Sequence, residues 1–472
     1  MNNYIIFFPD ELRAETVSMY GNTKIKTPNF ERLAKEGVRF DQCHVQNSVC
    51  SPSRCSLFTG QYVHTAGHRS LWNLLKPHEH NLFRYLKEAG WEVRIYGKND
   101  LFSNEAVSLS ADVFENKPGL GENPKPAASN EEQGNCMLFS PMEGDYTHHS
   151  DYQNLKAGMD FIRGRKAGDK PFILFLPLLF PHCPYTAHEP FYSMYGEGDI
   201  MPLRPACENK PMYHELIRQY RGLEKASLEK IQAVYMGMTS FIDTLLGELM
   251  DCVEQTGIKD KTMLIAAADH GDYAGDYGLI EKWPSGCEDV LTRVPLIISG
   301  PGCKQNTVSR ESVELFDITA TILEDTGITA RHTMYARSLW PQLRGGAGDP
   351  DRMVFCEGGY NKNEPHCNEG YPQGSRPFLR IPGSIYQPKG LQQWEHPESV
   401  GRAVMIRTKS HKLVLRTYGD HEFYDLEKDP LELNNVYGTA CYIPAQKDTE
   451  RRLLDWYIAT SDSVPTEADS RF

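Results

Sequence analysis

Short, continuous apolar runs, each followed at once by polar residues, most constrain what this chain can fold into. Four of them are clear: Asn3–Phe8, Glu92–Tyr96, Pro171–Leu178 and Thr262–Ala268. Runs of this length are typical of strands buried on both faces, as in parallel sheets. Helical patterns lie between them, at Asn29–Val38, His80–Gly90 and Leu228–Gly257. This alternation predicts an α/β fold with a large doubly wound sheet.

The last third of the chain has a different pattern. Residues Glu311–Gly327 are expected to form one more helix, and Glu357–Ser399, rich in Gly and Pro, is expected to be a long excursion near a site or a linker. From Arg402 onward apolar and polar residues alternate as in antiparallel strands, and a terminal helix is expected at Asp448–Thr460. We therefore expect a main α/β domain over residues 1–385 and a C-terminal subdomain, a small antiparallel sheet with one helix, over residues 386–472.

Composition excludes several classes of function. The formal net charge is −13 and no Lys/Arg-rich run is present, which argues against nucleic acid as the main partner. The longest apolar run, Phe172–Phe180, is far shorter than the roughly 20 residues that span a bilayer, so no membrane partner is expected. The 12 cysteines form no C-x-x-C pair, and the N-terminus does not resemble a signal peptide. We expect reduced thiols and a cytoplasmic protein, although a chain whose leader had been removed would look the same.

Polar side chains capable of chemistry follow each of the four predicted strands. In chain order they are Asp10 and Glu11, then Lys98, then His182, then Asp269 and His270. Since ligands bind at the carboxyl edge of open α/β sheets, these side chains are expected to form one site there.

The stretch SVCSPSRCSLFTG, residues 48–60, adds a candidate nucleophile. Ser51 is a favoured N-cap, Pro52 a favoured first helical residue and Gly60 a natural stop, so Cys50 is expected just outside a helix N-terminus. Free N–H groups at that position favour anions, and Arg54 in the first turn adds a positive charge. The alternative is that Cys50 is a half-buried structural cysteine.

Together these residue types indicate ester hydrolysis at a metal centre. Asp10, Glu11, Asp269 and His270 suit a hard or borderline divalent cation such as Ca²⁺, Mg²⁺ or Mn²⁺, and less so zinc. Arg54, Lys98, His182 and Lys282 could surround an anionic group; the alternative for each is a solvated surface charge. A metal, several cations and a nucleophile fit a sulfate or phosphate ester. A plain thiol is a poor nucleophile towards sulfur(VI), because its adduct has no easy exit.

The segment CSPSRCSLFTG resembles the signature of the type I sulfatases, C-[ST]-P-S-R followed by x-S-x-x-T-G, in which the cysteine is oxidised to Cα-formylglycine. Further motifs occur in the order expected for that family: Gly97-Lys98, Pro181-His182, DHGDYAGDYGLIEKW from Asp269, and EFYDLEKDPLELNN from Glu422. The resemblance covers essentially the whole chain. It implies an alkaline-phosphatase-like fold.

The resemblance also implies roles for individual residues. Cys50 would become the formylglycine hydrate, one hydroxyl of which attacks sulfur while the second later expels sulfate. Asp10, Asp269, His270 and the modified Cys50 would hold the metal, with Ca²⁺ favoured and Mn²⁺ or Mg²⁺ open. Arg54 would support the formylglycine. Lys98, His182 and Lys282 would contact the sulfate, with His182 or Lys282 as proton donor to the leaving oxygen.

Three positions depart from the pattern of many relatives. Glu11 stands where a second metal-binding aspartate is common, so it is left off the ligand set. His270 replaces the more frequent Asn, as in the related phosphonate monoester hydrolases. Asp100, in GKND, stands where a histidine is common, and it could act as a base or contact a substrate hydroxyl.

The remaining candidates are weaker. His64 and His68, close to Cys50 in sequence, are expected in a loop and could touch substrate, whereas His148 and His149 are expected at the surface. Cys55 is expected to be packed. Trp72, Trp283 and residues 357–399 are candidates for the leaving-group pocket.

The sequence favours a sulfatase acting on a sugar, aryl or steroid sulfate, with a formylglycine-generating enzyme as maturation partner. One alternative is a phosphonate monoester or phosphodiester hydrolase on the same fold. The other is a silent anion-binding homologue in which Cys50 is never converted.

Overall fold

The computed structural model describes residues 1–120, 135–362, 364, 384–466 and 470. Its centre is an eight-stranded sheet in the order β4-β3-β5-β1-β6-β7-β2-β8. The strands are β1 (Asn3–Asp10), β2 (Gly37–His44), β3 (Glu92–Tyr96), β4 (Val113–Glu115), β5 (Phe172–Pro181), β6 (Thr262–Ala267), β7 (Arg293–Ser299) and β8 (Thr307–Glu314). Only β7 runs antiparallel to its neighbours in this sheet.

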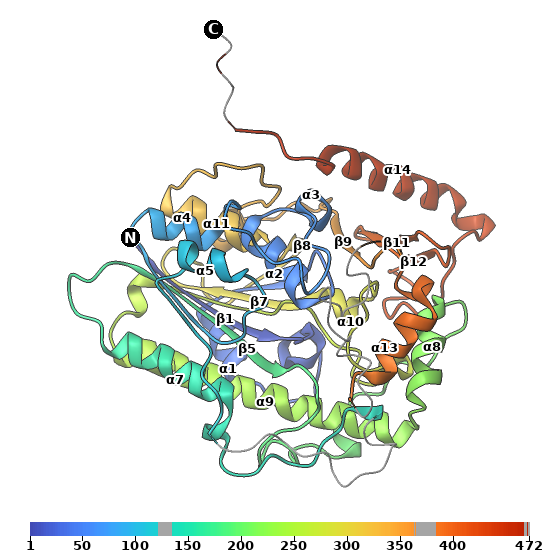
Figure 1. The fold of residues 1–472 in the computed structure, drawn as a ribbon, viewed down its shortest axis with the longest axis horizontal. Helices are drawn as coiled ribbons and strands as arrows, with labels where there is room; N and C mark the ends of the chain where they lie inside the picture. The colour runs from blue at the N-terminus through green and yellow to red at the C-terminus, as the bar shows by residue number, and fades with distance from the viewer. Residues whose placement is uncertain (121–134, 363, 365–383, 467–469, 471–472) are drawn as a thin grey trace.

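Helices cover both faces of this sheet (Figure 1). On one side lie α1 (Pro28–Glu36), α7 (Ser150–Arg163) and the long α9 (Lys225–Gln255). On the other lie α2 (Cys50–Thr59), α4 (Leu82–Glu88), α5 (Asn104–Ser110) and α11 (Asp317–Thr326). The doubly wound α/β prediction is therefore confirmed.

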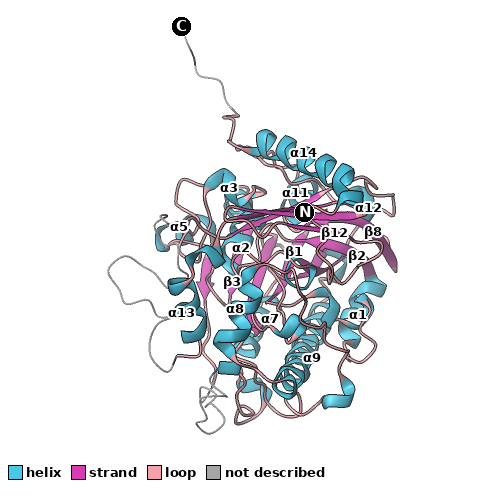
Figure 2. Cartoon of the chain, turned by 90° about the vertical axis from the view of Figure 1, so that its right-hand side faces the viewer, coloured by secondary structure: helices cyan, strands magenta, loops and turns pink. Residues whose placement is uncertain are grey.

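A second sheet of four antiparallel strands, in the order β12-β11-β10-β9, lies beside the main one (Figures 1 and 2). It consists of β9 (Val354–Gly358), β10 (Ala403–Arg407), β11 (His411–Arg416) and β12 (Glu422–Asp425), and α14 (Ile443–Thr460) packs against β10 and β11. The small antiparallel sheet and terminal helix match the prediction. β9, however, comes from the part of the chain before residue 386.

The other helices are short connectors or lie near the second sheet. They are α3 (Val63–Ala66), α8 (Met212–Arg221), α10 (Asp289–Thr292), α12 (Trp340–Leu343) and α13 (Gln387–Glu395). Much of the predicted excursion at 357–399 lies outside the described residues. No helix in the described ranges is both long and apolar enough to cross a bilayer.

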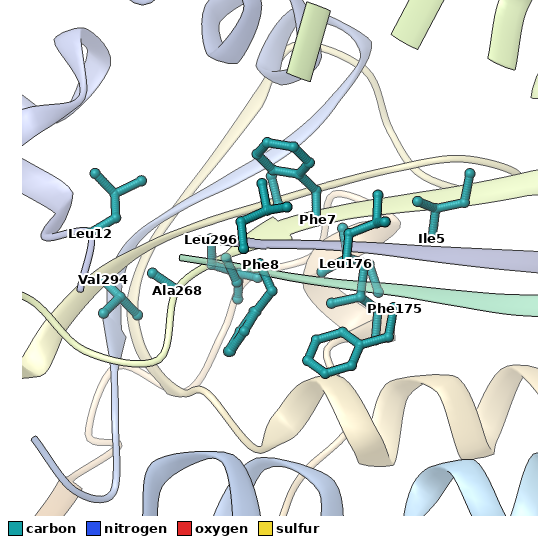
Figure 3. Packing of buried hydrophobic residues seen from close by; sticks show 14 of the residues in the cluster. Ile5, Phe7, Phe8, Leu12, Phe175, Leu176, Ala268, Val294 and Leu296 are labelled. Atoms are coloured by element: carbon teal, nitrogen blue, oxygen red, sulfur yellow. The ribbon is translucent and has the colours of Figure 1, made fainter. Parts of the chain in front are cut away.

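The main core lies around β1, whose residues Tyr4–Phe8 are completely buried. Figure 3 shows Phe7 and Phe8 packed among Leu176, Phe175 and Leu296 from neighbouring strands. Burying a large apolar side chain stabilises the fold by about 1.5–3 kcal/mol. This packing fixes the central strand, and with it the acidic residues at its end.

Two local predictions were wrong. Residues 311–314 belong to β8, and the helix α11 begins only at Asp317. β8 is an edge strand paired with β2, and this tertiary pairing overrides the local helical pattern. In α2, Val49 is the N-cap and Cys50 the first helical residue, so Ser51 does not cap the helix. Gly60 ends α2 in the left-handed conformation, as predicted.

Candidate active site

The candidate site lies where four adjacent strands and one helix end. Strands β3, β5, β1 and β6 are neighbours in the sheet. Asp10 closes β1, and Lys98, His182 and the pair Asp269-His270 follow the other three strands. Cys50, at the start of α2, reaches the same point. The side chains expected together at the sheet edge are therefore brought together.

Four of these side chains form a compact ligand group. Potential ligand atoms of Asp10, Cys50, Asp269 and His270 all lie within 4.8 Å of one another, and all four residues are buried. The Cys50 Sγ lies 3.2 Å from His270 Nε2 and 3.5 Å from Asp10 Oδ1. Two carboxylates and an imidazole are ligands that calcium, manganese or magnesium sites can use.

The tautomer of His270 suits metal binding. Its Nδ1 lies 2.9 Å from the carbonyl oxygen of Gly271, which can only accept a hydrogen bond. Nδ1 therefore carries the proton, and the lone pair of Nε2 faces the ligand group. Burial, more than any neighbouring charge, lowers the pKa of His270 and keeps the ring neutral.

Arg54 joins the two carboxylates. Its Nε donates to Asp269 Oδ2 at 2.8 Å and its Nη2 to Asp10 Oδ2 at 2.9 Å, and all three side chains are fully buried. Each aspartate thereby keeps its Oδ1 on the side of His270. Arg54 fixes the carboxylates in this orientation, and the Oδ1 of Asp269 also accepts the backbone N–H groups of Glu11 and His270.

Lys98 adds a second cation on Asp10. Its Nζ lies 2.7 Å from Asp10 Oδ2, 2.8 Å from Asp100 Oδ2 and 3.9 Å from Cys50 Sγ. Burial opposes ionisation of Asp10, but Lys98 and Arg54 outweigh it and hold the pKa of that carboxyl well below its usual value. The turn before Lys98 requires glycine, since a Cβ on Gly97, at φ +140°, would lie 2.1 Å from the carbonyl oxygen of Pro177.

Lys282, His182 and Glu11 form the opposite wall. Lys282 Nζ lies 2.9 Å from His182 Nε2 and 3.0 Å from Glu11 Oε2. His182 Nδ1 lies 2.6 Å from the carbonyl oxygen of Cys183, so Nδ1 carries the proton and Nε2 accepts from Lys282. Burial and the charge of Lys282 lower the pKa of His182 well below its usual value. The proton shared between Lys282 Nζ and His182 Nε2 therefore belongs to Lys282.

Glu11 and Asp100, which depart from the pattern of many relatives, both contact lysines. Glu11 points to Lys282 and is not part of the ligand group around Cys50, in line with its omission from the predicted set. Burial raises the pKa of Glu11 well above its usual value despite Lys282, and its Oε1 has no hydrogen-bond partner in the described structure. Asp100 contacts Lys98.

The thiol of Cys50 is not activated as it stands. Burial and the negative charge of Asp10 raise its pKa well above the usual value, against the effect of Lys282 and Lys98. Since the thiolate is the reactive form of cysteine, an unmodified Cys50 is a protonated, inert thiol in this environment.

Several weaker candidates contact other parts of the fold. His64 lies in α3 and bonds Glu357 and the carbonyl oxygen of Thr460, and His68 contacts Asn73 and Glu79. Cys55 is packed in the core, as predicted. Trp283 is also packed, with its indole N–H on the carbonyl oxygen of Ser399, whereas Trp72 is 36% exposed.

A cavity of about 660 Å³ beside His182 was not predicted. Its lining includes His149 and His188, of which His149 had been expected at the surface but is buried. Apart from the end of β5, the segments that form the cavity have no apolar periodicity. The only sequence signal was the concentration of histidines between residues 148 and 188.

The fold and this arrangement define a hydrolase of the alkaline-phosphatase-like class. A family model described as Sulfatase matches residues 2–328, and the chain belongs to that family. By class it is a sulfuric ester hydrolase.

Curated relatives match over nearly their whole lengths. The chain is 25% identical to the multifunctional alkaline phosphatase superfamily protein PehA of Trinickia caryophylli, over 98% of this chain and 94% of that protein. It is 23% identical to an N-acetylglucosamine-6-O-sulfatase of Bacteroides thetaiotaomicron, over 99% and 88%. Among solved structures, a phosphonate monoester hydrolase of Agrobacterium radiobacter shares the fold, with a TM-score of 0.80, 19% identity and coverage of 99% and 100%.

Proposed function

We propose that this protein hydrolyses a sulfate ester of a sugar, aryl or steroid alcohol to the alcohol and inorganic sulfate. The observation that carries the proposal is the convergence on Cys50, which lies within 4 Å of Asp10, His270 and Lys98 at a helix N-terminus. A tetrahedral anion held there would meet a candidate nucleophile, metal ligands and a cation at once.

The nucleophile is derived from Cys50. The buried, protonated thiol is unsuited to attack, while the segment CSPSRCSLFTG matches the motif in which cysteine becomes Cα-formylglycine. That group, as its hydrate, supplies two hydroxyls on one carbon. Asp10 and His270 lie where they would contact a hydroxyl at this position.

The donor atoms fit a resident divalent cation, with Ca²⁺ favoured over Mn²⁺ or Mg²⁺. Asp10, Asp269, His270 and the oxidised residue 50 would hold it. When bound, such a cation neutralises charge on the ester oxygens and polarises the group under attack. Arg54 pairs with both aspartates and holds their carboxylates in place at the centre.

The charge balance favours a singly charged substrate. Glu11 and Glu281 aside, the cations and carboxylates are equal in number, Arg54, Lys98 and Lys282 against Asp10, Asp100 and Asp269, and Glu281 is paired with Lys389. A divalent cation makes this group net positive, which suits one negative charge. Sulfate monoesters carry one, but so do phosphonate monoesters and phosphate diesters. Hydrolysis of those esters is therefore the second candidate function.

Lys282 is the proton source for the leaving oxygen. Its ammonium form is favoured by the carboxylates of Glu11, at 3.0 Å, and Glu281, at 3.9 Å. His182 accepts a hydrogen bond from Lys282 and holds the ammonium group in place. A proton delivered there lowers the barrier to departure of a poor leaving group.

Two measurements test the proposal. Intact mass of the peptide containing Cys50, from protein coexpressed with a formylglycine-generating enzyme, should reveal a species that reacts with a carbonyl reagent. The same protein should then hydrolyse 4-nitrophenyl sulfate with a higher kcat/KM than bis(4-nitrophenyl) phosphate or 4-nitrophenyl phenylphosphonate. The reverse order would select the second candidate function. Converted protein that hydrolyses none of them would contradict both.

A further inference from the structure

The cavity beside His182 has walls that are already assembled. Phe139 and Met142 donate backbone hydrogen bonds to the carbonyl oxygens of Tyr185 and Ala187, at 3.0 and 2.9 Å. The hydroxyl of Thr186 donates to the carbonyl oxygen of Ser140 at 2.7 Å. These bonds join the two long connections that precede α7 and follow β5. The cavity is thus part of the folded structure and opens beside the proposed proton source.

His188, one of the residues that line this cavity, carries a buried acceptor. The side chain is 4% exposed, and its Nδ1 lies 3.1 Å from the carbonyl oxygen of Gly144, so Nδ1 carries the proton. Its Nε2 has no hydrogen-bond partner within the described part of the chain. A buried acceptor without a partner is costly, so a group that donates to it would be bound favourably.

His149 presents a donor to the same cavity. Its Nδ1 accepts the backbone N–H of Asp151 at 3.1 Å, which leaves the proton on Nε2. Burial, with a smaller effect of His188, lowers the pKa of His149 to about 3, so the ring is neutral near pH 7. The centroids of the two rings are 6.1 Å apart. One wall therefore offers a neutral donor and a neutral acceptor.

The rest of the lining selects against negative charge. Its apolar side chains include Phe139, Leu179 and Phe180. The described lining residues include no lysine or arginine, and Glu143 is acidic. A carboxylate or a second sulfate inside this cavity would be desolvated without a lysine or arginine partner.

We propose that this cavity is the subsite for the alcohol part of the ester and takes an uncharged, hydroxyl-bearing ring. The ring packs on the apolar walls, while its hydroxyl groups donate to His188 Nε2 and accept from His149 Nε2–H. This inference rests on the proposed function, because it makes His182 the boundary between the reacting group and the alcohol. It predicts selection of neutral over anionic alcohols.

The kinetic test uses aryl sulfates that differ only in one ring substituent. Meta and para isomers of hydroxymethylphenyl, methylphenyl and carboxyphenyl sulfate are compared with converted wild type and His188→Phe. Wild type should prefer the hydroxymethyl ester over the methyl ester by about 3- to 10-fold in kcat/KM in at least one isomer, as for one added hydrogen bond. The carboxyphenyl esters should be the poorest substrates. In His188→Phe the hydroxymethyl preference should disappear while the methyl ester is retained.

Binding of the released alcohols separates failure of the subsite from failure of the reaction. Saturation-transfer NMR with 3- and 4-(hydroxymethyl)phenol should show binding to wild type that is weakened in His188→Phe, and little binding of the hydroxybenzoates. His78→Phe, at an exposed histidine, is the matched control, and melting temperatures verify that each variant is folded. Binding through His188 without hydrolysis of any ester would contradict the proposed function and support the subsite.

Three results would overturn the subsite. The first is an equal loss of kcat/KM for all esters in a folded His188→Phe. The second is a preference of wild type for the carboxyphenyl esters. The third is binding of the alcohols that His188→Phe leaves unchanged.

Discussion

The ligand group around Cys50 and the cavity beside His182 are both buried, but they are built in opposite ways. The first places two carboxylates, an imidazole and a thiol where strands and a helix end or begin, and Arg54 ties its carboxylates together. The second is made of imidazoles and apolar side chains on β5 and on the connections before α7 and after β5. The comparison indicates that the regular elements set the chemistry performed on the anion. In the proposed subsite, the residues around the cavity select the alcohol part of the ester.

The largest expected effect is at the nucleophile. Cys50→Ala should lower kcat/KM for an aryl sulfate by at least about 10⁴-fold, because the attacking group is removed. The matched control is Cys55→Ala, five residues further along α2, where the thiol is packed in the core. Steady-state assays on both variants decide the point. Full activity in Cys50→Ala would exclude the proposed mechanism.

Lys282 should matter most for poor leaving groups. Lys282→Met is expected to lower kcat by about 10²- to 10⁴-fold for a phenyl or alkyl sulfate, and much less for 4-nitrophenyl sulfate, whose leaving oxygen needs little protonation. A plot of log kcat against leaving-group pKa should be steeper for the variant than for wild type. Equal losses across the series would mean that Lys282 only binds the anion.

Substitution of Arg54 tests how much its buried ion pairs contribute to the free energy of unfolding. Arg54→Met leaves Asp10 and Asp269 buried without their common partner and should reduce the free energy of unfolding in EDTA by about 3–5 kcal/mol. Arg32→Met is the control, since Arg32 pairs with three carboxylates but is partly exposed, and it should cost at most about 1 kcal/mol. Urea denaturation compares them. Equal losses would show that burial of the pair is unimportant.

The smallest effect concerns the neutral region and depends on pH. The folded-state pKa of His149, about 3, lies below the unfolded value near 6.5. Between these values only the unfolded chain binds the proton, so stability falls as pH drops from about 6.5. His149→Asn keeps an N-cap for α7 and does not titrate. Relative to this variant, wild type should lose up to about 1.4 kcal/mol per pH unit.

The matched variant for this last experiment is His148→Asn, at the exposed neighbouring residue. It should keep the wild-type dependence of unfolding free energy on pH. If His149→Asn also keeps it, then His149 is protonated in the folded protein, and the cavity wall is not neutral.

How much was predictable from sequence differs between the two regions for a physical reason. Asp10, Lys98, His182 and Asp269 each follow an apolar run, and parallel strands bring their carboxyl ends to one edge, so the site followed from local pattern. The contact of Lys282 with Glu11 did not follow from local pattern. It depends on Glu11 adopting φ +66° and on a loop that places Lys282 well beyond the end of β6 at Ala267, neither of which has a periodic signal.

The cavity was missed because it is formed by tertiary pairing of irregular segments. His149 carries no mark of burial in sequence, since its neighbour His148 is exposed. The helix prediction for residues 311–314 was wrong for the same reason, because the conformation of the edge strand β8 is decided by its pairing with β2. The domain boundary at residue 385 stays a prediction.

The hydrogen bonds that join residues 139–142 to 185–187 have an evolutionary consequence. These two connections are hydrogen-bonded to each other, so residues 139–142 and 185–187 would have to be exchanged together as a matched unit. Recombination that transplants both segments together would change the alcohol accepted and preserve the catalytic residues. Transplanting either one alone would break the backbone pairing at Phe139 and Met142. New specificities on this scaffold should therefore arise by paired inheritance of the two segments.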